Sequence, residues 1–175
     1  MHFMRSINVL ALTAAVAAGT LAIGSPAAPA SAEPQCASNQ NLWQVHRRLD
    51  GAIDQLGHDD RDYGGHREAA VADLQKAREQ LVAAEHFSVR RDRDDAECFR
   101  AYGAPGGSDV PWGTRAQGAS DGNIWHVRAW TDELIAQLNR DDRDYGGHKA
   151  AAIRDLQAAR GQMLAAERYA YDHGH

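Results

Sequence analysis

Three aspartates and a histidine occur together in the octapeptide DDRDYGGH, which is present twice, at residues 59–66 and 141–148. Carboxylate oxygens are hard ligands for divalent cations, and neutral imidazole is a common metal ligand. A cation could therefore use an aspartate and the histidine of each copy. The candidate binding residues are Asp59, Asp60, Asp62, Tyr63, His66, Asp141, Asp142, Asp144, Tyr145 and His148. Within this set, the predicted metal ligands are Asp62, His66, Asp144 and His148.

A turn between two helices would use the same residue types. Gly64 and Gly65 permit the positive φ angles that a tight entry into a helix requires. The Asp62 carboxylate is placed to accept hydrogen bonds from amides of the next helix. Tyr63 can cover the end of a bundle while its hydroxyl group stays in water. The turn explains every residue type, so metal binding is the alternative interpretation.

Two further observations bear on the kind of ligand. A calcium loop counted from Asp60 would need glutamate at its twelfth position, which is Val71. A Gly-Gly helix start beside Arg61, His66 and Arg67 resembles an anion site, although the neighbouring aspartates would compete for the same amides. The sequence therefore leaves a weak divalent-metal site and a weaker anion site open beside the structural turn.

The octapeptide belongs to a longer internal repeat. Residues 41–87 align without gaps on residues 123–169, and 26 of the 47 aligned positions are identical. This similarity indicates that one unit was duplicated within the chain. Each unit carries an apolar stripe at helical spacing on both sides of its octapeptide. The stripes are Leu42, Val45, Leu49, Ala52 and Leu56, then Ala70, Leu74, Ala77, Leu81 and Ala84, with Ile124, Val127, Thr131, Leu134 and Leu138, then Ala152, Leu156, Ala159, Met163 and Ala166, in the second unit.

Two helices joined by a short turn form an αα-hairpin, and two hairpins can bury their stripes against each other as a four-helix bundle. The sequence thus predicts an all-α fold of two tandem, duplicated hairpins. The first hairpin is expected at residues 33–91 and the second, with a C-terminal tail, at 123–175. Between them, residues 92–122 are rich in glycine and proline and predict a long irregular crossover anchored by Trp112. We expect a compact crossover that leaves both octapeptides at the same end of the bundle, where His66 and His148 could share a ligand.

The first 32 residues have the features of a cleaved secretory signal peptide: a basic start, an apolar run and the small-residue sequence Ala30-Ser31-Ala32. Export favours a disulfide between Cys36 and Cys98, which are the two cysteines of the chain. The sequence predicts no membrane span. A net charge of −5 disfavours binding to nucleic acid. We therefore expect a periplasmic or secreted protein whose partner is another envelope protein or a second copy of itself.

No catalytic signature occurs: G-x-S-x-G, P-loop, H-E-x-x-H and C-x-x-C sequences are all missing from the chain. The inward stripes are alanine and leucine rather than the glutamates of carboxylate-bridged di-iron bundles. We expect that the protein is not an enzyme. We expect structural roles for the other polar and aromatic residues. His46, His58 and His86 are predicted to be exposed, and the repeated charges Glu85, Glu167, Arg78 and Arg160 to lie on a solvated face. Trp43 and Trp125 are predicted to be anchors in the core.

The segments DYGGHREAAVADLQKAREQL and DYGGHKAAAIRDLQAARGQM resemble helical parts of small exported bacterial proteins with a D-x-G-G-H-[RK] turn. This resemblance covers both repeats and implies the fold and export but no activity. The chain is more loosely similar to small periplasmic metal-binding four-helix proteins, which carry histidines along every helix. The resulting hypothesis is an exported binding or structural module of the cell envelope, with weak divalent-metal binding as the alternative.

Overall fold

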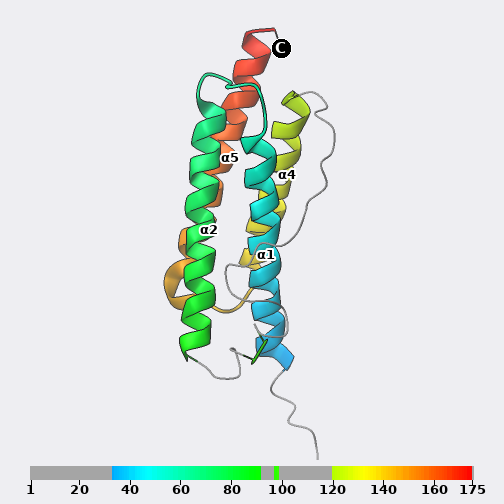
Figure 1. The fold of residues 1–175 in the computed structure, drawn as a ribbon. Helices are drawn as coiled ribbons and strands as arrows, with labels where there is room; N and C mark the ends of the chain where they lie inside the picture. The colour runs from blue at the N-terminus through cyan, green and yellow to red at the C-terminus, as the bar shows by residue number, and fades with distance from the viewer. Residues whose placement is uncertain (1–32, 92–96, 99–119, 175) are drawn as a thin grey trace, which may run out of the picture.

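The computed structural model describes residues 33–91, 97–98 and 120–174, and this part of the chain is almost entirely helical. Its longer helices lie in two pairs, each joined through one copy of the octapeptide. The sequence-based prediction of an all-α four-helix bundle is confirmed (Figure 1). The elements are α1 (Glu33–Gly57), α2 (His66–Arg91), α4 (Ser120–Asn139), the short η1 (Tyr145–Gly147) and α5 (His148–Asp172).

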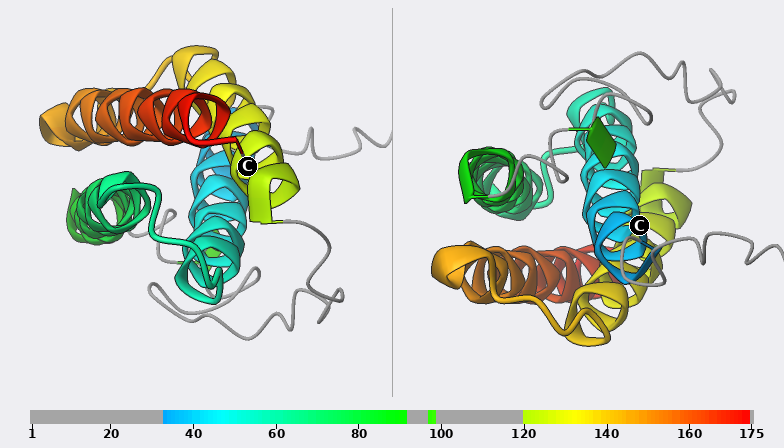
Figure 2. Two further views of the ribbon diagram at one scale, coloured as in Figure 1. Left: turned by 90° about the horizontal axis from the view of Figure 1, so that it is seen from above. Right: turned by 90° about the horizontal axis from the view of Figure 1, so that it is seen from below.

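The helices are arranged around a square. Helix α1 contacts α2 and α4, and α5 contacts the same two helices, so α1 and α5 lie across one diagonal and α2 and α4 across the other (Figure 2). Neighbouring helices are antiparallel, whereas α2 and α4 run in the same direction (Figure 1). The chain between Arg91 and Ser120 therefore connects opposite ends of the bundle.

The two octapeptides lie at opposite ends of the bundle. The first turn lies beside the C-terminal end of α5, where Gly64 faces Tyr169. The second turn lies beside the start of α1 and the end of α2, where Gly146 faces Phe87. The prediction that both turns share one end was wrong, because the crossover is long enough for either connection and helix packing decides between them.

The interior is made of the two pairs of predicted stripes. All twenty stripe positions are buried, with exposed fractions of 0–1%. Removing a leucine side chain from water contributes about 1.5–3 kcal/mol, so the leucines provide most of the favourable energy. Helices α2 and α5 form the most extensive contact, and each faces the other with alanine at alternate turns of its stripe. Small side chains allow two helix axes to approach closely.

Helix α1 begins earlier than the apolar stripe indicated. Cys36 lies within α1, where it forms a disulfide with Cys98 across a Cα–Cα distance of 5.4 Å. The predicted disulfide is confirmed. Within residues 33–91 and 120–174, no helix is long and apolar enough to cross a membrane. The expected signal peptide and Trp112 lie outside the described residues.

Candidate functional site

Each octapeptide contains three consecutive residues with left-handed backbone. The φ angles are 52°, 65° and 86° at Tyr63, Gly64 and Gly65, and 53°, 67° and 87° at the equivalent residues of the second copy. The positive φ angles predicted for the glycines are confirmed. The tyrosine was not foreseen, because left-handed backbone costs a residue with a Cβ atom about 1–2 kcal/mol. Burial of the ring, which is 3% exposed, offsets this cost.

The first glycine of each pair also allows an aromatic ring to approach the turn. A Cβ atom added to Gly64 would lie 2.8 Å from Cε2 of Tyr169, and one added to Gly146 would lie 2.7 Å from Cε2 of Phe87. A Cβ atom added to the second glycine of either pair would meet nothing within 4 Å. The first glycine is therefore required for packing and for φ, and the second for φ alone.

The predicted metal ligands take part in contacts within the bundle. The Asp62 carboxylate accepts a hydrogen bond from the Gly65 amide at 3.0 Å, which is the helix-entry role expected for it. His66 Nδ1 lies 3.0 Å from Gln162 Oε1 on α5, and His148 Nδ1 lies 3.0 Å from Gln80 Oε1 on α2. Each histidine thus links α2 to α5 at its own end of the bundle. The two histidines cannot share one ligand, so that prediction was wrong.

No group of three or more histidine, cysteine, aspartate or glutamate side chains is placed to hold a metal ion in the part of the chain that the structure describes. Asp60, Asp142 and Asp144 are exposed to solvent on the two turns. The Asp144 main-chain carbonyl accepts a hydrogen bond from the Gly147 amide at 3.2 Å. The described geometry therefore adds nothing in favour of a metal centre at either turn.

Asp141 is the centre of a hydrogen-bond network at the second turn. Its Oδ1 atom accepts from Ser38 Oγ at 2.5 Å and from the Arg143 amide at 3.0 Å. Its Oδ2 atom accepts from Tyr145 Oη at 3.1 Å and from Asn41 Nδ2 at 3.3 Å. Burial is the main reason that the pKa of Tyr145 is raised, so its hydroxyl group remains a donor. The network joins α1 to the second turn.

Asp59 occupies the same place in the first turn but has fewer partners. Its Oδ1 atom accepts from the Arg61 amide at 3.2 Å, and its Oδ2 atom is buried without a hydrogen-bond partner. Burial raises the pKa of the Asp59 carboxyl group. The folded state therefore holds this proton to higher pH than the unfolded chain does. As a result, Asp59 makes the free energy of unfolding fall as pH rises above about 4.

Substitution by asparagine is expected to lower the free energy of unfolding more at Asp141 than at Asp59. At pH 7, Asp141→Asn is expected to lower the free energy of unfolding by about 2 kcal/mol, because charge-assisted hydrogen bonds are lost and an NH₂ group faces other donors. Asp59→Asn should change it by less than about 1 kcal/mol, because the substitution removes a buried charge with one hydrogen bond. Urea unfolding of both variants provides the measurement, and equal losses would contradict the assigned networks.

A recess of about 520 Å³, lined mainly by polar residues, lies beside the Asp141 network. Helix α1 contributes Ser38 and Asn41, α4 contributes Gln137, and residues 140–143 form the other side. The Gln137 amide donates to Asn41 Oδ1 at 2.7 Å. The sequence pattern indicated the aspartates at this recess but not Ser38, Asn41 or Gln137. The internal repeat could have indicated the Gln137–Asn41 pair, because both residues have identical counterparts in the other unit. There, Gln55 donates the equivalent hydrogen bond to Asn123 Oδ1 at 3.1 Å.

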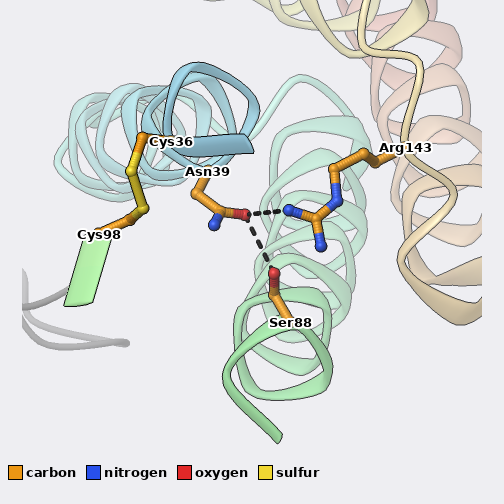
Figure 3. The surroundings of a disulfide bond; sticks show 5 residues. All are labelled: Cys36, Asn39, Ser88, Cys98 and Arg143. Atoms are coloured by element: carbon orange, nitrogen blue, oxygen red, sulfur yellow. Dashed lines mark hydrogen bonds between the residues drawn. A yellow bond between two sulfur atoms is a disulfide. The ribbon is translucent and has the colours of Figure 1, made fainter. Parts of the chain in front are cut away.

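The disulfide lies at the same end of the bundle as the recess. Figure 3 shows Cys36 and Cys98 beside Asn39, whose Oδ1 atom accepts from Ser88 Oγ on α2 at 3.0 Å and from Arg143 Nη1 at 3.2 Å. Asn39 and Ser88 are both fully buried. These bonds connect α1, α2 and the second turn beside the recess.

Three residues differ from their expected exposure to solvent. His46 and Glu85 were expected at the surface, but they are 2% and 0% exposed and lie 2.9 Å apart. Trp125 was expected in the core, but it is 52% exposed. The predicted exposure of His58 and His86 is confirmed. Two polar positions on apolar stripes were misassigned because their partners lie on another helix.

Comparisons of the chain with protein-family models, with curated proteins and with solved structures found no match.

Proposed function

We propose that the protein is an exported helical-bundle binding module of the cell envelope, and that its ligand site is the recess between α1 and the second turn. The observation that carries this proposal is the difference between the two copies of one octapeptide. Asp141 of the second copy is held by residues of α1 and borders the recess, whereas Asp59 is held within its own turn. The disulfide beside the recess fits an exported protein.

The chemistry of the recess favours a small polar ligand. Hydroxyl and amide groups of Ser38, Asn41 and Gln137 both donate and accept hydrogen bonds. Arg140 and Asp142, both exposed, add one charge of each sign at the rim. These groups suit a ligand that combines hydroxyl, amide and carboxylate groups, as a saccharide–peptide fragment does.

The proposal is tested by titrating the ¹⁵N-labelled mature protein with muramyl dipeptide, which carries all three types of group. We expect the side-chain amide signals of Asn41 and Gln137 to shift. Gln137→Leu should weaken binding at least tenfold, because a site built to hydrogen-bond a polar group rejects an apolar replacement strongly.

Gln55→Leu is the matched control. It removes the equivalent bond to an asparagine, 3.1 Å long, at the other end of the bundle. This variant should bind as the wild type does. Absence of any shift at Asn41 and Gln137, or equal weakening in both variants, would contradict the proposed site.

The alternative function, weak divalent-metal binding, gains no support from the described contacts, since His66 and His148 both use Nδ1 to bind a glutamine. Because the turns lie at opposite ends, metal binding would require two independent sites. Titration of the same labelled protein with Zn²⁺ tests for metal binding. Chemical-shift changes that arise separately around His66 and around His148 would favour this alternative.

A further inference from the structure

Two of the charged side chains that line the recess are already engaged by the fold. Each oxygen of the Asp141 carboxylate accepts two hydrogen bonds from neighbouring residues. Arg143 donates to Asn39 Oδ1 at 3.2 Å, and its guanidinium group lies over the Tyr145 ring at 5.2 Å from the centroid (Figure 3). The charges of Asp141 and Arg143 therefore serve contacts within the bundle.

Arg140 and Asp142, the other two charged residues of the lining, are engaged differently. Both side chains are exposed to solvent at the recess. Neither forms an ion pair or a hydrogen bond with another side chain within residues 33–91, 97–98 and 120–174. Their charges are therefore free to interact with a ligand that enters the recess.

The internal repeat shows what Arg140 lacks. Its counterpart in the first hairpin is His58, which also directly precedes an octapeptide. His58 Nδ1 lies 2.8 Å from the main-chain oxygen of Asp54 and 3.3 Å from Asp54 Oδ1, four residues earlier in the chain. The counterpart of Asp54 is Ala136, which has no carboxylate. The second hairpin thus places a cation at this position without the acid that accompanies it in the first.

The chemistry of this cation favours a carboxylate as its partner. A guanidinium group can donate two parallel hydrogen bonds to one carboxylate. Asp142, which lines the same recess, repels a doubly charged phosphate group more strongly than a singly charged carboxylate. The hydroxyl and amide groups of Ser38, Asn41 and Gln137 are then left to bind the neutral part of the ligand.

We infer that Arg140 is the specificity-determining residue of the recess, and that it selects ligands with a single carboxylate over the corresponding neutral amides. The inference rests on the proposed function, because it names the charged group that the same site binds. The arginine is exposed, so its attraction for a carboxylate is screened by salt. The preference for the carboxylate should therefore decrease as the ionic strength rises.

The first test compares muramyl dipeptide, which has one carboxylate, with the analogue in which this group is a primary amide. Titrations of the ¹⁵N-labelled protein, followed at the side-chain amides of Asn41 and Gln137, give both affinities. At low salt the wild type should bind the carboxylate about fivefold more tightly than the amide, as an exposed ion pair allows. Arg140→Gln should abolish this preference. Arg154→Gln, which removes an exposed arginine of α5, is the control and should retain it.

The second test keeps Arg140 and supplies it with an acid. Ala136→Asp places a carboxylate four residues before the arginine, as Asp54 precedes His58 in the first hairpin. Ala136 is exposed and does not line the recess, so the substitution leaves the other ligand contacts in place. We expect this variant to lose the preference for muramyl dipeptide over its amide. Ala136→Asn, which adds a side chain of the same size without a charge, should retain it.

The outcomes separate this inference from the proposed function. If the wild type binds both probes equally, with shifts at Asn41 and Gln137, the role of Arg140 is overturned and the proposed function stands. If neither probe shifts these two signals, both are overturned. Displacement of muramyl dipeptide by an equal concentration of inorganic phosphate would contradict the selection of a carboxylate.

Discussion

Replacing Gly146 by alanine is expected to lower the free energy of unfolding by about 3 kcal/mol, which is among the largest effects of a single methyl group in this protein. The left-handed backbone, with φ of 67°, contributes about 1–2 kcal/mol of this loss. Displacing the Phe87 ring, which would lie 2.7 Å from the new Cβ atom, contributes about 1–3 kcal/mol more. Gly64→Ala should behave similarly, because Tyr169 approaches it at 2.8 Å.

Two control variants separate backbone strain from packing. Gly147→Ala has the strained backbone but an open Cβ position, so it should lose only about 1–2 kcal/mol. Gly161→Ala lies in the middle of α5 with nothing near its Cβ position, and it should gain about 0.5–1 kcal/mol. Thermal or urea unfolding gives all four values. If Phe87→Leu fails to reduce the cost of Gly146→Ala in a double-mutant cycle, the ring contact is not its cause.

Removing the disulfide by Cys36→Ser together with Cys98→Ser is expected to lower the free energy of unfolding by about 3–4 kcal/mol. The two cysteines are 62 residues apart, so the bond closes a long loop and strongly restricts the unfolded chain. The bond also holds Cys98 against the start of α1, beside the Asn39 and Ser88 contacts (Figure 3). The variant should therefore also lose order at the end of the bundle that carries the recess.

Urea unfolding of the variant and of the wild type with and without reductant measures this effect. Peptide mapping without reductant should recover the linked cysteines from the wild-type protein. A variant with unchanged midpoint and slope would contradict the stabilising role. The matched control is reductant added to the variant, which should change nothing.

The helices and their buried faces follow from the sequence alone. A stripe of leucine and alanine at three- and four-residue spacing can avoid water only on one face of a helix, and all twenty predicted stripe positions are buried. The spacing of the same stripes also indicated that His46 and Glu85 are buried. His46 follows Leu42 by four residues, and Glu85 follows Leu81 by four. Helical spacing placed both residues inside, and only their polarity led to the prediction that they are exposed.

The glycine conformations in the turns were also evident from the sequence, because a short connection between antiparallel helices needs backbone angles that glycine adopts without strain. The left-handed tyrosines were not evident. An aromatic residue takes that conformation only where burial of its ring offsets the strain. The surroundings that bury Tyr63 and Tyr145 are made by residues far away in the chain.

The placement of the two turns was decided only by the tertiary structure. A crossover of this length can return along the bundle or stay at one end, because the energy of closing a loop changes slowly with its length. The contact between the alanine-rich faces of α2 and α5 sets the choice, and it places the octapeptides at opposite ends. Identical octapeptides then acquire different partners. Asp141 meets Ser38 and Asn41, whereas Asp59 keeps a buried oxygen atom without a partner, because hydrogen bonds depend on which helix ends lie beside each turn.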